Sequence, residues 1–229
     1  IGADTEGWCT IIGHRRMGMV LTVVVTGAAA TATASASPAH EGGHEMAGAA
    51  GITGDDAPAA APIDPVLAPL TDERVHKVTL TVTEVELEVA PGVRQRRWTY
   101  SGRVPGPTLH GRVGDVFEIT LVNDGSMGHS IDFHAGALAP DRPMRTIPPG
   151  ESLTYRFTAT KSGIWMYHCS TMPMSAHIAA GMHGAVIIEP ADLPRVDRSY
   201  VLVQSEAYVN GDGRSALREV DADAVAAEQ

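Results

Sequence analysis

Short segments that alternate apolar and polar residues follow one another along the middle of this chain. These segments cover residues 78–89, 96–100, 116–122, 153–158, 164–169 and 185–189. Such alternation predicts half-buried β-strands, and intervening sequences such as Pro105-Gly106-Pro107 are typical of turns. The alternation slips once, at Glu84, which predicts a β-bulge there. Many short strands at nearly even spacing, with no convincing helix among them, favour an antiparallel β-sandwich, which we expect over residues 73–191.

The first 36 residues are typical of a secretory signal peptide. His14, Arg15 and Arg16 precede the apolar run 17–30, and small residues follow it as far as Ala34-Ser35-Ala36. The apolar run is shorter than the ~18–20 residues that a membrane-spanning helix needs. An uncleaved N-terminal anchor is the alternative interpretation. Either way, we expect the folded part to be exported, to the periplasm, the extracellular space or the cell surface.

The segments on either side of the sandwich differ from it in composition. Residues 37–72 are rich in Ala, Gly and Pro without any strand or helix period, which is typical of a flexible linker. Past the sandwich, Tyr200–Val203 resembles a fresh strand, and residues 216–229 are charged and Ala-rich, as in a short helix. We therefore interpret residues 192–229 as an inter-domain segment and the start of a second domain that continues beyond this chain.

Charge and cysteine content narrow the classes of function. The chain has 17 Lys and Arg against 27 Asp and Glu, for a net charge of −10, so we expect neither nucleic acid nor an anionic membrane as a partner. Of its two cysteines, Cys9 lies in the predicted signal segment, which leaves Cys169 alone in the sandwich. One cysteine among several histidines excludes a disulfide framework and points to a metal or a reactive thiol.

The residues around Cys169 form the ligand set of a blue-copper site. His129, His177 and Met182 offer two imidazoles and a thioether beside the Cys169 thiolate. Two His, one Cys and a weak axial Met are typical of that kind of centre, whereas a zinc site normally uses more Cys or His and no Met. The bland alternatives are a buried, unreactive Cys169 and a Met182 that only fills the core.

A second group of residues is expected on the opposite face of the same strands. Side chains alternate faces along a strand, so His168 points away from the face that its neighbour Cys169 occupies. His129 and His134 are five positions apart and also face opposite ways if extended, while Asp132 shares the face of His134. Two outward histidines cannot hold a catalytic metal alone, so we expect the third ligand from another polypeptide surface. Ordinary surface histidines, and an Asp132 that caps a turn, are the alternatives.

Several stretches of this chain resemble the first domain of copper-containing nitrite reductases, within the wider multicopper oxidase group. The matching stretches are YSGRVPGPTL (100–109), GDVFEITLVN (114–123), HSIDFHAGAL (129–138), PPGESLTYRF (148–157), SGIWMYHC (162–169) and HIAAGMHGAVIIEP (177–190). This resemblance implies a cupredoxin-like, Greek-key β-sandwich. The loop between Cys169 and His177 is one residue shorter than the usual family pattern, and His183 stands where a small polar residue is common.

Carried over position by position, the resemblance implies two coppers. The residues implied for type 1 copper are His129, Cys169, His177 and Met182. Type 2 copper takes His134 and His168, with a third ligand from a second domain, and Asp132 is the acid that hydrogen-bonds and protonates nitrite. The resemblance thus implies an enzyme that reduces nitrite to nitric oxide with electrons from a donor protein or small reductant, in a homotrimer.

Two other functions remain open at this point. One is a different two-domain multicopper oxidase that acts on phenols or metal ions, and the other is an electron-transfer cupredoxin with one copper. A laccase-like oxidase would carry His on both sides of the cysteine, but Ser170 follows Cys169 here. An electron carrier would have no need of His168 before the cysteine.

Overall fold

The computed structural model describes residues 5–8, 20–23, 63–137, 144–209 and 219–227. The chain divides into two compact units, residues 1–50 and 51–229. In the first unit, strands β1 (Thr5–Trp8) and β2 (Val20–Val23) pair antiparallel. Most of the predicted signal segment and linker lies outside the described residues. Among the described residues, no helix is long and apolar enough to cross a membrane.

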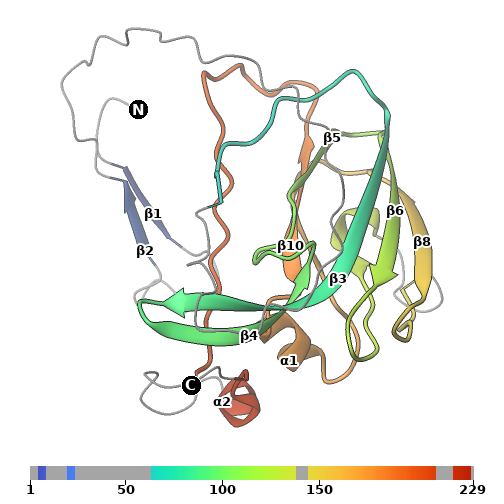
Figure 1. Ribbon diagram of the computed structural model, residues 1–229. Coiled ribbons are helices and arrows are strands. Elements are labelled where there is room, and N and C mark those ends of the chain that lie inside the picture. Colours follow the sequence, from blue (N-terminus) through green and yellow to red (C-terminus); the bar gives the residue numbers. More distant parts are fainter. Residues whose placement is uncertain (1–4, 9–19, 24–62, 138–143, 210–218, 228–229) are drawn as a thin grey trace, which may run out of the picture. The chain divides into compact units, whose positions relative to one another are not determined.

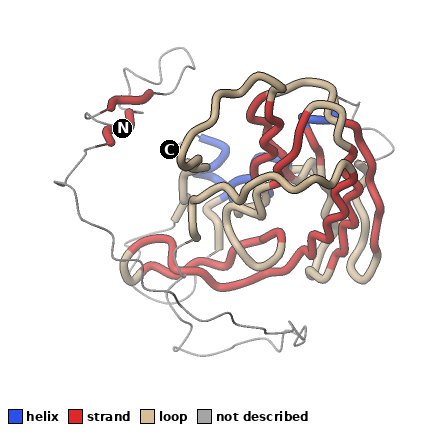
Figure 2. The backbone as a smooth tube through the Cα atoms, turned by 90° about the horizontal axis from the view of Figure 1, so that it is seen from above, coloured by secondary structure: helices blue, strands red, loops and turns tan. Residues whose placement is uncertain are grey.

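Two four-stranded sheets make up the second unit (Figure 1). The first sheet has the order β4 (Val93–Tyr100), β3 (Val75–Ala90), β6 (Val116–Asn123) and β8 (Ser152–Thr158). The second sheet has the order β5 (Leu109–Arg112), β10 (His183–Glu189), β9 (Gly163–His168) and β7 (Asp132–Phe133). Strands dominate this unit, and its helices are short (Figure 2). The predicted all-β sandwich is confirmed.

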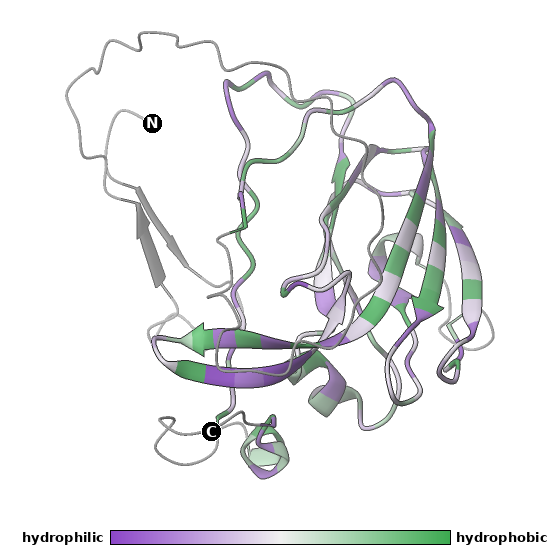
Figure 3. Ribbon diagram, viewed as in Figure 1, coloured by the Kyte–Doolittle hydropathy of each residue, from purple (hydrophilic) through white to green (hydrophobic). Residues whose placement is uncertain are grey.

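The core lies between the two sheets because each strand buries alternate residues. Hydrophobic and hydrophilic positions alternate along β3 and β6 (Figure 3). Aromatic side chains from both sheets fill much of the space: Phe117 stacks on Phe157 at 5.0 Å, and Phe133 stacks on Tyr155 at 5.5 Å between ring centroids. Tyr167 contacts Phe133 at 5.4 Å and donates a hydrogen bond to a backbone carbonyl. This aromatic layer fixes β7 and β9, the two strands nearest the predicted ligands.

The expectation of a purely antiparallel sandwich is wrong. Strands β3 and β6 pair in parallel, and so do β5 and β10. Strand β4 runs antiparallel to β3, and the chain then passes through β5 in the other sheet. It returns to the first sheet as β6, which lies beside β3 and runs in the same direction. Apolar alternation gives the face that a residue occupies, but it carries no information on strand direction.

The expected β-bulge at Glu84 is also wrong. The register of β3 against β4 is regular from Val82 to Glu88, and it shifts only between Glu88 and Ala90. Pairing of β3 with β6 ends at Val82, so the later part of β3 pairs with β4 alone. Both faces are half-buried there, and neither face therefore requires an unbroken apolar row.

The region after the sandwich is only partly as expected. Tyr200 forms an isolated bridge with Val66, and Tyr200–Val203 is not a strand. A short helix, α2 (Ala222–Ala227), does lie within the predicted helical segment. Within the sandwich, four further elements were not expected: strands β5 and β7, helix α1 (Met174–Ala179) and the 3₁₀ turn η2 (His134–Gly136). The domain boundaries stay predictions, including the start of a second domain.

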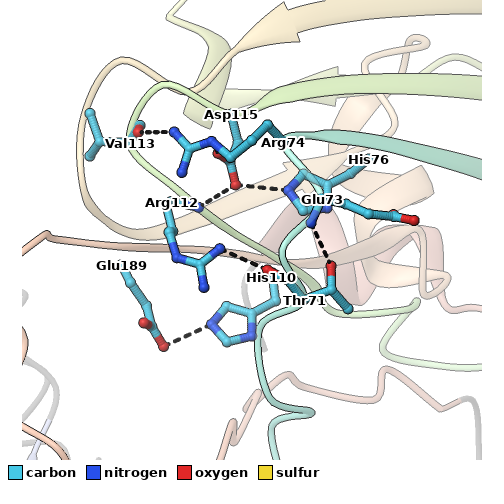
Figure 4. Close-up of polar contacts among 9 residues, drawn as sticks. All are labelled: Thr71, Glu73, Arg74, His76, His110, Arg112, Val113, Asp115 and Glu189. Atoms are coloured by element: carbon cyan, nitrogen blue, oxygen red, sulfur yellow. Dashed lines mark hydrogen bonds and ion pairs between the residues drawn. The ribbon is translucent and has the colours of Figure 1, made fainter.

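A buried carboxylate holds one end of the sandwich together (Figure 4). Asp115 has no solvent-exposed surface. Its Oδ2 accepts hydrogen bonds from His76 Nε2 and the Arg112 backbone N–H, and its Oδ1 forms an ion pair with Arg74 Nε, each at 2.8 Å. Burial raises the pKa of Asp115, but these hydrogen bonds and the charge of Arg74 outweigh it and lower the pKa below its usual value. Asp115 therefore joins the start of β3 to the β5–β6 turn.

Replacing this carboxylate should destabilise the sandwich. We expect Asp115→Ala to lower the free energy of unfolding at pH 7 by about 3 kcal/mol, because the half-buried His76 and the half-buried backbone N–H of Arg112 lose their partner. A group with a lowered pKa stabilises the fold above its unfolded pKa, and this contribution is lost as the pH falls through the folded value. The difference between variant and wild type, measured by urea denaturation, should therefore shrink below about pH 4.

The matched control is the exposed ion pair of Lys77 and Glu118, whose charged atoms lie 3.8 Å apart. Glu118→Ala should change the free energy of unfolding by less than about 0.5 kcal/mol. Equal effects of the two substitutions would contradict the role assigned to Asp115.

Candidate metal centres

One group of metal-ligating atoms is fully enclosed by the sandwich. His129, Cys169 and His177 place their ligand atoms within 4.8 Å of one another. His177 Nδ1 lies 3.4 Å from Cys169 Sγ and 3.2 Å from His129 Nδ1. All three residues are buried, with exposures of 3% or less. The same nitrogen of each imidazole thus faces a shared point beside the sulfur.

The backbone around this group explains why the three side chains converge. His129 lies in an isolated bridge with Ile147, in which each residue donates its N–H to the carbonyl of the other. Cys169 directly follows the end of β9, and its N–H donates to the Met182 carbonyl at 3.0 Å. His177 lies on helix α1, and its own carbonyl accepts from the Met182 N–H at 3.1 Å.

Met182 is therefore tied by its backbone to both Cys169 and His177. Its side chain has no exposed surface and belongs to the same core cluster as Cys169. The four residues predicted for the first site thus come from one bridge, the end of β9, the short helix α1 and the residue before β10. The structure brings them into a single buried region.

The surroundings of Cys169 favour its thiolate. Burial raises the pKa of the thiol, but hydrogen bonds, chiefly from His129, His177 and the backbone N–H of Ser130, outweigh burial and lower the pKa to about 5. A thiolate is the form that binds a metal. The group is therefore electrostatically prepared for a cation before any ion binds.

A second group lies where β7, η2 and β9 meet. Asp132, His134 and His168 also have ligand atoms within 4.8 Å of one another, and the Nε2 atoms of His134 and His168 are 3.0 Å apart. Asp132 is opposite His168 in the β7–β9 register. His134 is exposed, Asp132 is half-buried and His168 is buried. This group is therefore open to solvent on one side, unlike the first.

A hydrogen bond fixes the protonation of one of these histidines. The Nδ1 of His168 lies 2.9 Å from the carbonyl oxygen of Cys169, which can only accept, so Nδ1 carries the proton. The other ring nitrogen, Nε2, faces His134 and is left as the ligand atom. This backbone contact orients the ring in the way that second-shell partners orient metal-bound histidines.

The two groups are joined through adjacent residues. His168 belongs to the second group and Cys169 to the first, as expected from side chains that alternate faces along a strand. His129 and His134 also fall into different groups, although for a different reason. His129 lies in an isolated bridge and His134 in η2, so they are not on one extended strand.

The chemistry of the donor atoms fits copper in the first group. A soft thiolate with two imidazoles suits copper. The buried Met182 would add a soft thioether to this set and not a hard oxygen ligand. The second group offers two imidazoles and a carboxylate on an open face, which is a partial ligand set. In the described part of the chain, these are the two groups of three or more His, Cys, Asp or Glu residues that could hold a metal.

Sequence reasoning missed three residues that touch the first group. Trp98 of β4 lies edge-on to His177 at 4.7 Å and to His129 at 5.7 Å between ring centroids. Ser130 Oγ lies 3.7 Å from the Cys169 sulfur, and Thr171 Oγ1 lies 3.0 Å from Ser130 Oγ. Ser130 could have been found, since it directly follows His129, whereas Trp98 reaches the site only through strand pairing.

Comparison with known proteins gives consistent results. Residues 81–192 match the family model described as multicopper oxidase. The copper-containing nitrite reductase of Neisseria gonorrhoeae is 35% identical over 158 residues, which are 67% of this chain and 40% of that protein. A solved copper nitrite reductase from Nitrosomonas europaea is 41% identical, with a TM-score of 0.59 over 67% of this chain and 53% of that chain.

A solved multicopper oxidase is 35% identical, with a TM-score of 0.51 over 58% of this chain and 49% of that chain. The present chain spans about two fifths of the length of the first curated relatives that it matches. The segment that matches the family model contains every residue of both ligand groups and Met182. The cupredoxin-like domain of this chain therefore belongs to the multicopper oxidase family.

Proposed function

We propose that this chain is part of a copper-dependent enzyme that reduces nitrite to nitric oxide. The observation that carries this proposal is the pair of ligand groups with different chemistry, back to back, on the neighbouring residues His168 and Cys169. A carrier with one copper would need only the buried group. The similarity to copper-containing nitrite reductases, which are 35% identical over 67% of the chain, favours nitrite over phenols or metal ions as substrate.

The buried group is suited to accept and pass on single electrons. His129, Cys169 and His177 would hold type 1 copper, with Met182 as the weak axial ligand. His134 and His168 would hold type 2 copper, with a third ligand from a second domain. When bound, the first ion supplies a one-electron carrier and the second supplies a Lewis acid for a nitrite oxygen. The homotrimer expected from the family resemblance would bring such a domain into place.

Asp132 is the residue of this chain that is suited to supply protons. Conversion of nitrite to nitric oxide and water consumes one electron and two protons, so a proton donor is needed beside the substrate. The carboxylate of Asp132 lies within the second group, half-buried and opposite His168 in the β7–β9 register. There it would hydrogen-bond to nitrite and hand over a proton from the solvent side.

The backbone between the groups gives the electron a short route. One path is the covalent link from Cys169 to His168, and another is the hydrogen bond from His168 Nδ1 to the Cys169 carbonyl. The electron would come from a donor protein or a small reductant. Helix α1, which carries His177, also carries Met174, which is 41% exposed, so a donor could approach the buried group from this side.

Export of the protein is a further part of the proposal. It is supported by the charged flank, the short apolar run and the small-residue exit within residues 1–36. An exported enzyme would meet nitrite and its electron donor outside the cytoplasm.

Copper binding tests the first ligand group. We expect the chain loaded with Cu(II) to show an intense visible charge-transfer band and a type 1 electron paramagnetic resonance signal. Cys169→Ser should abolish both, because the thiolate is the origin of the band. His134→Ala should leave both intact, since His134 belongs to the other group. Retention of the band in Cys169→Ser, or its loss in His134→Ala, would contradict the assignment.

Turnover tests the second group and Asp132. In protein that also carries the proposed second domain, Asp132→Asn should lower nitric oxide production from nitrite by about 100-fold or more, because a positioned proton donor is lost. Asp124→Asn, an exposed Asp in the loop after β6, is the control and should keep full activity. Unchanged turnover in Asp132→Asn would refute the proton-donor role. Oxygen consumption with phenols instead of nitrite turnover would favour the oxidase alternative.

A further inference from the structure

A chain of hydroxyl groups leads from the surface of the sandwich to the Cys169 sulfur. Ser130 is 1% exposed, and its backbone N–H and side-chain Oγ lie 3.5 Å and 3.7 Å from Cys169 Sγ. Ser130 Oγ is 3.0 Å from Thr171 Oγ1, which in turn is 2.9 Å from Thr146 Oγ1. Thr146 is exposed. Three hydroxyls thus connect solvent to a fully buried sulfur.

The donors and acceptors along this chain have a preferred direction. A thiolate has no proton, so it can only accept a hydrogen bond. The Ser170 N–H donates to Ser130 Oγ at 3.1 Å, which occupies one lone pair of that oxygen. Hydrogen bonds to an ionised acceptor are the stronger ones, so the Ser130 proton is best directed at Sγ. Thr171 can then donate to Ser130, and Thr146 to Thr171.

Each donor in such a sequence polarises the next. Hydrogen bonds in series strengthen one another inside a protein, where the effective dielectric constant is low. The sulfur therefore meets two donors from the same residue, the Ser130 N–H and a Ser130 O–H that Thr171 makes more acidic. Both donors withdraw electron density from the sulfur.

We propose that this hydroxyl chain, Ser130–Thr171–Thr146, raises the reduction potential of the metal centre at Cys169. The inference rests on the proposed function, in which that centre carries single electrons. Hydrogen bonding around the cysteine sulfur is one of the terms that set the potential of a copper–thiolate site. A less electron-rich sulfur stabilises the oxidised ion less, and the reduced form is favoured.

The backbone of Ser130 is held independently of its hydroxyl. Tyr100 Oη donates to the Ser130 carbonyl at 2.6 Å, and the bridge between His129 and Ile147 fixes the preceding residue. Removing the hydroxyl therefore leaves the backbone path and the N–H donor to the sulfur in place. This makes Ser130 a positioning and tuning residue whose hydroxyl can be tested by itself.

The test is the reduction potential of the copper-loaded full chain, measured by spectroelectrochemistry on the thiolate band. We expect Ser130→Ala to lower the preference for the reduced over the oxidised form by about tenfold, equal to about 59 mV for one electron. The charge-transfer band should also move to lower energy. Thr171→Val should shift both in the same direction by a smaller amount, because Ser130 keeps its proton but loses the donor behind it.

The control is Thr120→Val, since Thr120 pairs with Thr154 on the exposed face of β6 and β8, away from both ligand groups. It should leave the potential unchanged. Wild-type potential in a Ser130→Ala protein that retains its thiolate band would overturn the inference and leave the proposed function standing. If Ser130→Ala does not fold, an unshifted Thr171→Val overturns it. Absence of any thiolate band in the wild type would overturn both.

Discussion

Two hydrogen bonds at the backbone of Met182 determine the geometry of the buried centre. The Cys169 N–H donates to the Met182 carbonyl, and the Met182 N–H donates to the His177 carbonyl. These bonds close the segment from residue 169 to 182 on itself, so a strand end, a short helix and the start of the next strand share one point. Only His129 has to be supplied from elsewhere, and its bridge with Ile147 does so.

Burial of a thiolate is costly unless hydrogen-bond donors surround it, and here the fold provides them. His129, His177 and the backbone of Ser130 lower the pKa of Cys169 to about 5 in spite of its burial. Because neighbouring residues on a strand face opposite ways, the same β9 end presents His168 to an open face with different chemistry. The end of β9 therefore separates the buried ligand group from the solvent-accessible one. The peptide bond between His168 and Cys169 connects the two groups covalently.

The features that could be predicted from the sequence are those that depend on neighbouring residues or on the chemistry of single side chains. Strand parity separates His168 from Cys169 without knowledge of the fold, and the mixture of thiolate, imidazole and thioether specifies the class of metal. Features that depend on contacts between distant segments could not be predicted. The alternation of apolar residues does not show that β3 and β6 pair in parallel, and the contact of Trp98 on β4 with His177 on α1 joins residues far apart in the sequence. Helix α1, with six residues, is too short to show a helical period.

The central claim is that a copper ion is held by one sulfur and two imidazoles inside this sandwich. X-ray absorption at the copper edge of the metal-loaded chain tests it most directly. The account predicts one short copper–sulfur path and two histidine nitrogens, and loss of the sulfur path when Cys169 is replaced by Ser. A spectrum with only nitrogen and oxygen neighbours in the unaltered protein would contradict it.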